Sequence, residues 1–419
     1  MSDSFDLRSR IYWQRMGWAL LTALLSAIGA FIFIGLMDTG FDLLWPDVTD
    51  WTPFSGSWWM VAIMTGAGLL VGLIHHFTAA SELDVFEAVD EGDMDPKPVP
   101  ASVLASLISL IGGFALGPEV PAGMLAAGLG GWIARRRKMD AESTRVNVIG
   151  GVSAAYAGLF SSPFAVLMIL LESKHIQSIA YYGTLLIAVL AATIGFAFFY
   201  VLGGEAPSSL LGLISPPAYD LRIWHLGVGI LLGIVAVPVA LILPILLKIL
   251  GRLVAPLNDK PIIRGVLGGF LLGLLAYALP ITIGLGTTDM EIVTQQAAEI
   301  GVGLLLVFAV AKVLALSGAL SFGFIGGPIF PLLFVGSTVG SAILLLFPQL
   351  PEGLVLGCMI VAVPAAIVPI PLAIAVIGAL IVGLPLTNTA PIFLAALVAF
   401  SIVRGSGIGG GKKETQAES

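Results

Sequence analysis

The residue of this sequence best suited to chemistry is Glu119, a carboxylate set between two prolines. The segments on either side, 101–116 and 122–134, carry no charge. An ionisable group between such apolar segments is costly to bury, so it marks a candidate functional site. Gly117 permits an unusual turn, and Pro118 suits the first turn of a helix. We therefore expect Glu119 at a helix N-terminus, where free N–H groups favour negative charge; the alternative is an ordinary capping glutamate in a polar loop.

A second turn of the same kind occurs 210 residues later (327 − 117 = 210). Gly327-Pro328-Ile329-Phe330-Pro331 follows an apolar segment, as Gly117-Pro118-Glu119-Val120-Pro121 does. Another proline-marked pair, Ser162-Pro163-Phe164 and Ile370-Pro371-Leu372, repeats at nearly the same offset. Two halves with broken helices at matching positions predict a binding site at the interface between the repeats. The alternative is that Gly-rich membrane helices resemble one another by composition alone.

The two turns predict an anion site made of backbone. Helices that begin after Gly117 and Gly327 would direct free N–H groups toward the same place, without any positively charged side chain. We expect no buried Lys or Arg to pair with the anion. An ionised Glu119 would compete with the anion for these N–H groups, and a protonated Glu119 would release them.

Composition places these turns in a membrane. The 419 residues are 58% hydrophobic and 11% charged, with a mean hydropathy of +1.03; an average soluble protein has about 25% charged residues. We predict an all-α polytopic membrane protein with spans such as 16–36, 58–77, 119–134, 301–320 and 329–347. The 51 glycines and 25 prolines interrupt several spans, so some helices are broken and partly re-entrant.

The same composition excludes other classes of protein. A single cysteine, Cys358, and four scattered histidines give no disulfide framework and no metal site. No nucleophile–base pair or phosphate loop indicates an enzyme, and nothing indicates a cofactor. No basic tract is long enough for a nucleic acid partner.

Basic residues predict the orientation of the chain in the cell's inner (plasma) membrane. Arginines before the first span and the run Arg135-Arg136-Arg137-Lys138 indicate cytoplasmic segments. The predicted organisation is a cytoplasmic N-terminal segment (1–15), a first membrane repeat (16–203), an inter-repeat loop (204–222), a second membrane repeat (223–404) and a disordered cytoplasmic tail (405–419).

The two motifs, in this order and on this hydropathy, resemble the CLC family of chloride channels and chloride/proton antiporters. Residues 117–121 are similar to its Gly-Arg-Glu-Gly-Pro motif, and residues 327–331 to its Gly-x-Phe-x-Pro motif. The resemblance covers roughly 15–404 and is closest to a short, divergent bacterial branch. It implies an inverted-topology repeat, a homodimer with one pore per subunit, and Glu119 as the gate. It also implies that the N–H groups of Val120, Ile329 and Phe330 bind the anion, and that Gly117 and Gly327 are part of the anion-binding site.

Several departures from the family concern the site. Pro328 has no N–H to offer, and the family's serine motif is absent, so Thr78 is the candidate hydroxyl; the alternative is a solvated loop threonine. The chain ends before the family's final helix, so we assign no pore tyrosine. Ser173 stands at the antiporters' proton-relay position. The neighbouring Glu172 is the candidate substitute, unless it pairs with Lys174.

We therefore predict transport of a small anion, most of all chloride, through a pore gated by Glu119. The partners are that anion, possible protons in coupled exchange, and the lipid bilayer. The alternatives are a fluoride or other anion/proton antiporter, or a regulatory membrane subunit that has lost transport.

Overall fold

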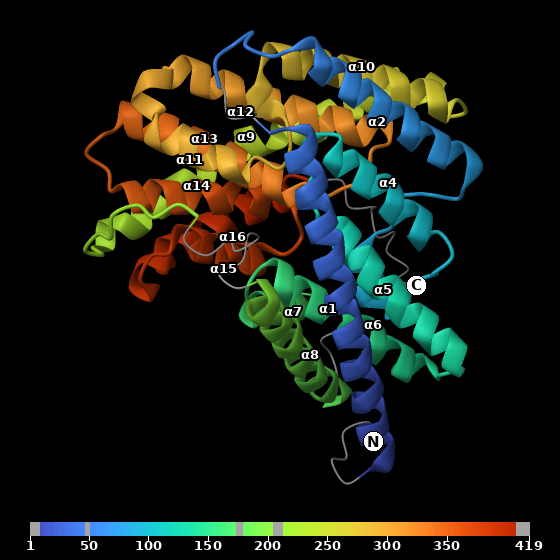
Figure 1. The fold of residues 1–419 in the computed structure, drawn as a ribbon. Helices are drawn as coiled ribbons and strands as arrows, with labels where there is room; N and C mark the ends of the chain where they lie inside the picture. Colours follow the sequence, from blue (N-terminus) through green and yellow to red (C-terminus); the bar gives the residue numbers. More distant parts are fainter. Residues whose placement is uncertain (1–8, 47–50, 173–178, 204–212, 408–419) are drawn as a thin grey trace, which may run out of the picture.

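The computed structural model describes residues 9–46, 51–172, 179–203 and 213–407. Within these ranges the chain is helical and forms no named strand (Figure 1). The helices are α1 (Arg10–Leu44), α2 (Trp58–Phe77), α3 (Val85–Glu91), α4 (Val99–Ile111), α5 (Glu119–Arg137), α6 (Ala141–Leu159), α7 (Pro163–Glu172), α8 (Ile179–Gly203), α9 (Ile223–Val254), α10 (Pro261–Ala278), α11 (Thr287–Gln295), α12 (Ala297–Phe322), α13 (Ile329–Leu346), α14 (Glu352–Ile367), α15 (Pro371–Val382) and α16 (Ala390–Gly405).

Eight helical segments of the described chain are long and apolar enough to cross a membrane, and four further apolar helices are shorter. The shorter helices are α4, α7, α14 and α15. Because their ends cannot be left in lipid, such helices must be enclosed by protein. The predicted all-α polytopic membrane fold with broken helices is confirmed.

Most helix boundaries follow the sequence closely. Helix α2 has the predicted limits, and α5 and α13 begin at Glu119 and Ile329, as expected. Helix α12 is kinked at Gly301, where φ is 77° and ψ is 157°, and this is where the predicted span begins. Helix α1 begins at Arg10, before the expected span, because Ser9 caps it by accepting a hydrogen bond from the Ile11 N–H at 3.3 Å. The short helices α3 and α11 were not predicted.

The two halves of the chain pack in the same way. Helix α1 contacts α4, α6 and α8, and α9 contacts α12, α14 and α16. The pairs α3–α5, α5–α6 and α6–α8 recur as α11–α13, α13–α14 and α14–α16. Helices eight places apart in the order are therefore equivalent, which is the arrangement expected of an internal repeat.

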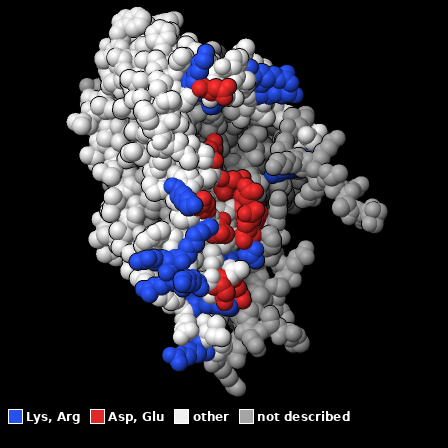
Figure 2. All heavy atoms as spheres, turned by 90° about the vertical axis from the view of Figure 1, so that its right-hand side faces the viewer, with Lys and Arg blue, Asp and Glu red and all other residues white. Residues whose placement is uncertain are grey.

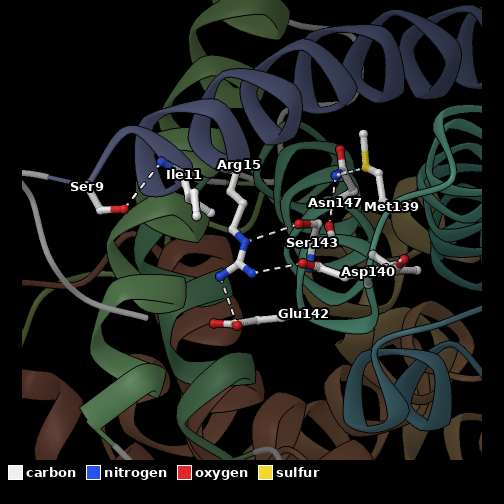
Figure 3. A network of polar contacts seen from close by, with 9 residues as sticks. Ser9, Ile11, Arg15, Met139, Asp140, Glu142, Ser143 and Asn147 are labelled. Carbon is white, nitrogen blue, oxygen red and sulfur yellow. Dashed lines mark hydrogen bonds and ion pairs between the residues drawn. The ribbon is translucent and has the colours of Figure 1, made fainter. Parts of the chain in front are cut away.

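Charged side chains gather on the side of the first repeat where α1 and α6 begin (Figure 2). The Arg15 guanidinium contacts Asp140 at 3.1 Å and Glu142 at 2.8 Å, and donates to Ser143 Oγ at 3.1 Å (Figure 3). Hydrogen bonds from Ser143, assisted by Arg15, lower the pKa of Asp140. Together these contacts fix the start of α1 against the start of α6.

The acidic segment before α4 and the basic end of α5 also meet. Arg135 donates to both carboxylate oxygens of Asp93, at 3.0 and 2.9 Å, and to the Met94 carbonyl at 2.9 Å. Both ionic side chains are about half exposed, so the pair contributes at most ~1 kcal/mol. The main effect of this ion pair is to hold the acidic segment before α4 next to the basic end of α5, on the same side of the protein.

Helices α2 and α10 join the two halves through glycines. A Cβ on Gly68 would collide with the Gly265 carbonyl, and one on Gly269 with the Met64 carbonyl. Small residues of this kind allow two membrane helices to approach closely and to gain van der Waals contact.

We expect Gly68→Ala to lower the thermal midpoint of the purified protein in detergent, because overpacking of this kind costs about 1–3 kcal/mol. Gly66 lies on the same helix, and a Cβ added there would have no neighbour within 4 Å. Gly66→Ala is therefore the matched control and should unfold at or above the wild-type midpoint. Equal midpoints for the two variants would contradict the close helix contact.

Candidate functional site

The first turns of α5 and α13 meet at a short backbone bridge between the two repeats. The Gly117 N–H donates to the Gly327 carbonyl at 2.7 Å, and the Gly327 N–H donates to the Gly117 carbonyl at 2.8 Å. Both N–H groups are therefore occupied. In this arrangement Gly117 and Gly327 use their N–H groups to join the repeats, and their anion-binding role stays a prediction.

Neither glycine has room for a side chain. A Cβ at Gly117 or Gly327 would collide with the carboxylate of Glu119. The bridge and the carboxylate thus fill the same small volume, so the glycines in the two motifs are a steric requirement of the site.

Glu119 reaches from its own helix to the other repeat. Its Oε1 accepts a hydrogen bond from the Ile329 N–H at 2.7 Å, and the residue is only 2% exposed. Its Oε2 is buried and has no hydrogen-bond partner in the described part of the chain. The carboxylate therefore occupies an N–H at the N-terminus of α13, where an anion would also bind. An unpartnered buried oxygen is costly, so this oxygen is a natural place for a proton.

A cavity of about 390 Å³ opens beside this carboxylate. It lies between the loop before α3, the first turns of α5 and α13, and the end of α14. Its lining residues are Glu82, Leu83, Asp84, Val85, Phe86, Glu119, Val120, Tyr156, Pro328, Ile329, Ile367, Val368 and Pro369.

The cavity has an acidic wall that sequence reasoning did not foresee. Asp84 caps α3 by accepting from the Phe86 and Glu87 N–H groups at 2.9 and 3.0 Å. Burial, together with the nearby Asp84, raises the pKa of Glu82. Among the described residues no three His, Cys, Asp or Glu side chains are arranged to hold a metal ion.

Thr78 lies elsewhere. It ends α2, is exposed, and donates its hydroxyl to the Ile74 carbonyl at 2.6 Å. The wall of the cavity is formed instead by residues 82–86, a few positions later. Of the predicted backbone ligands, Val120 and Ile329 line the cavity, and the Phe330 ring stacks on Phe160 at a centroid distance of 6.2 Å.

Glu172 contacts the other repeat as Glu119 does. Its two carboxylate oxygens accept from the Leu372 and Ala373 N–H groups at 2.7 and 3.0 Å, at the N-terminus of α15. The expected partner Lys174 and the relay position Ser173 lie outside the described residues. Helix α15 begins at Pro371, two positions after the cavity residues 367–369, so Glu172 holds the helix start that follows this wall.

We expected no buried Lys or Arg to pair with the anion, and a buried lysine with other partners was not foreseen. Lys312 of α12 is completely buried. Its Nζ donates to the Ile281 and Ile283 carbonyls, both at 3.1 Å, and lies 3.8 Å from Asp289 Oδ2. The ammonium also lies 4.9 Å from the centre of the Phe334 ring. The sequence contains no sign of this because the partners of Lys312 are distant: the carbonyls come from the segment 281–283, Asp289 from α11, 23 residues away (312 − 289 = 23), and Phe334 from α13.

Lys312 supports the site through the loop that it holds. That loop docks on the first repeat, where the Gly284 N–H donates to the Gly113 carbonyl at 2.9 Å. Gly113 precedes the Glu119 turn by a few residues. The buried ammonium thus fixes both the loop against the first repeat and the first turns of α13 through Phe334.

The geometry and the sequence agree with one known family. The family described as "Voltage gated chloride channel" matches residues 67–404, which is most of the chain. The chain belongs to this family, the CLC proteins. A relative from Escherichia coli O7:K1 (strain IAI39 / ExPEC), named "Putative ion-transport protein YfeO", is 28% identical over 322 residues, or 73% of this chain and 72% of the relative.

Solved CLC structures share the fold. A slow cyanobacterial Cl−/H+ antiporter superposes with a TM-score of 0.78 at 19% identity, over 96% of each chain. A CLC-type fluoride/proton antiporter gives a TM-score of 0.77 at 21% identity, over 95% of this chain and 97% of the antiporter. A eukaryotic CLC transporter gives 0.71 at 14% identity, over 95% and 73%. This CLC chain therefore has the fold of multi-pass membrane transporters.

We expect Lys312→Met to destabilise the protein strongly, by about 3–5 kcal/mol, because it leaves a buried carboxylate without its cation. Adding Asp289→Asn should recover part of the loss. Thermal unfolding in detergent measures both effects, with the exposed Lys248→Met as the control. If Lys312→Met unfolds at the wild-type midpoint, the buried ammonium does not stabilise the fold.

Proposed function

We propose that this CLC protein carries a small anion, most of all chloride, through the cavity beside α5 and α13, with Glu119 as the gate. The observation that carries the proposal is the 2.7 Å hydrogen bond from the Ile329 N–H to Glu119 Oε1. A side-chain carboxylate occupies the N–H that a permeant anion needs, and it reaches there from the other repeat.

The proposed gating step is a protonation. An ionised carboxylate holds the Ile329 N–H and repels an incoming anion across a poorly solvated cavity. A proton that adds to Oε2 removes the charge and weakens Oε1 as an acceptor. The neutral side chain can then leave, and the anion takes the free N–H groups at the start of α13, close to those of α5 at Val120. When the proton departs, the carboxylate returns and the path closes.

The chemistry of the site is also compatible with the alternative function, a fluoride or other anion/proton antiporter. Small anions share the need for N–H donors, and the backbone groups described here do not distinguish chloride from fluoride. A Cl−/H+ antiporter and a fluoride/proton antiporter resemble this fold about equally. A regulatory subunit without transport is the remaining alternative, and a flux measurement decides against it or for it.

We also propose the setting in which the pore works. Residues 16–203 and 223–404 form the two repeats, joined by 204–222, and the chain assembles as a homodimer in the inner (plasma) membrane. The N-terminal segment 1–15 and the tail 405–419 lie in the cytoplasm. The contact of Arg15 with the start of α6, beside the basic end of α5, supports a common cytoplasmic side.

Glu119→Gln should mimic the protonated gate in protein reconstituted into liposomes. We expect chloride efflux that no longer changes between pH 5 and 8, whereas wild-type efflux should rise as the pH falls. Glu352→Gln, a change at an exposed glutamate, is the matched control and should behave as wild type. Efflux of Glu119→Gln that still follows pH would remove Glu119 from the gating role.

The same liposomes test the substrate and the coupling. Efflux is measured with chloride, fluoride, nitrate and bicarbonate, with and without a proton gradient. Chloride efflux with little proton movement supports the proposal. Fluoride preference, or a fixed ratio of protons to anions, would support the antiporter alternative, and no efflux of any anion would support the regulatory one.

Cysteine labelling can test the orientation. Cys358 is fully buried, so its replacement by Ala gives a background without thiols. In that background Arg136→Cys should react with an impermeant maleimide only after cells are opened, and Ser55→Cys should react in intact spheroplasts. Both positions are exposed in the fold. The opposite pattern would invert the proposed topology.

A further inference from the structure

The cavity has an unusual balance of side-chain hydrogen-bonding groups. Its polar side chains are Glu82, Asp84, Glu119 and Tyr156. An ionised carboxylate can only accept hydrogen bonds, whereas a phenol can donate one. Among the described lining residues, Tyr156 is therefore the only side chain that can donate to an anion while the three carboxylates are ionised.

The position of Tyr156 fits such a role. The residue is on α6 and is 3% exposed. Its hydroxyl makes no hydrogen bond with any described residue, although it lines the cavity. The hydroxyl opens into the cavity, where water or a ligand can accept its hydrogen bond. The ring is fixed by an edge contact with Phe160 at 5.5 Å between centroids, and Phe160 stacks on Phe330 of α13.

A glycine makes room for this hydroxyl. Gly123 lies on α5, one turn after Glu119, and a Cβ there would come within 2.5 Å of the Tyr156 hydroxyl. The Tyr156 hydroxyl therefore packs against the backbone of α5 at a position without a side chain. The hydroxyl is held next to the helix whose first residue carries the proposed gate.

We propose that the Tyr156 hydroxyl donates a hydrogen bond to the anion in the cavity and so contributes to its affinity. This inference rests on the proposed function for the identity of the site, since it assumes that an anion occupies this cavity. The ligand is a monovalent halide, held by the phenol on the α6 side and by backbone N–H groups on the α13 side.

The direct test is anion binding by isothermal titration calorimetry on detergent-purified protein, with chloride and fluoride in separate arms. Tyr156→Phe removes only the oxygen. The loss of a hydrogen bond to a charged group lowers binding affinity about tenfold. We therefore expect the Kd to rise about tenfold. Tyr200→Phe, on the exposed face of α8, is the control and should keep the wild-type Kd. Unchanged unfolding midpoints establish that both variants are folded.

A second variant keeps the hydroxyl but moves it. Gly123→Ala should also raise the Kd, because the new methyl group displaces the phenol from its seat. Wild-type Kd values for Tyr156→Phe in both anion arms would overturn the proposal, whatever the flux experiments show.

Binding and flux separate this inference from the proposed function. Weaker binding by Tyr156→Phe in a protein that moves no anion would support the ligand role and overturn transport. Anion efflux with wild-type affinity and rate in Tyr156→Phe would support transport and overturn the ligand role. Absence of halide binding by wild type and by Glu119→Gln, in which the carboxylate no longer competes, would overturn both.

Discussion

The structure depends on the meeting of two helix N-termini at the Gly117–Gly327 bridge. Each half of the chain contributes one glycine, and the pair exchanges two backbone hydrogen bonds of 2.7 and 2.8 Å. The bridge fixes the start of α13 beside the start of α5. Only with that register can Glu119 reach the Ile329 N–H, and only without Cβ atoms can the carboxylate fit beside the bridge. Steric and electrostatic requirements of the site therefore coincide in one contact.

A pair of helix ends aimed at each other concentrates partial positive charge, and the chain balances it with carboxylates. Glu119 caps α13 from the first repeat, and Glu172 caps α15 from the first repeat as well. Both glutamates thus stabilise N-termini that belong to the second repeat. The two glutamates differ in their hydrogen bonds. Both carboxylate oxygens of Glu172 accept hydrogen bonds, whereas Oε2 of Glu119 accepts none from the described chain. The fully bonded carboxylate suits a fixed wall, and the half-bonded one suits a moving part.

The sequence predicted what depends on local rules and missed what depends on distant partners. Proline, glycine and hydropathy located the starts of α5 and α13, because a helix N-terminus is a local event. The sequence offered Thr78 as the candidate hydroxyl, but the cavity wall is formed by residues 82–86, which lie in and after the loop that precedes α3. The burial of Lys312 was not predicted because its four partners come from a distant loop and from two other helices, α11 and α13. Tyr156 gave no signal beyond being a tyrosine in a small-residue segment, and its meaning comes from Gly123 across the helix contact.

An acidic cavity is an unexpected place for an anion, and this constrains how the proposed transport can work. Two like unit charges 4 Å apart repel by about 4 kcal/mol at an effective dielectric constant of 20. For an anion beside ionised Glu119, this repulsion would cancel most of the binding free energy that hydrogen bonds from backbone N–H groups provide. Occupancy by an anion must therefore favour the protonated carboxyl, and by reciprocity protonation must favour the anion. Such linkage would arise at the proposed gate itself, without any relay residue at position 173. Proton-sensitive anion flux and proton-coupled exchange are thus separate properties, and the proposed gate would produce the first without the second.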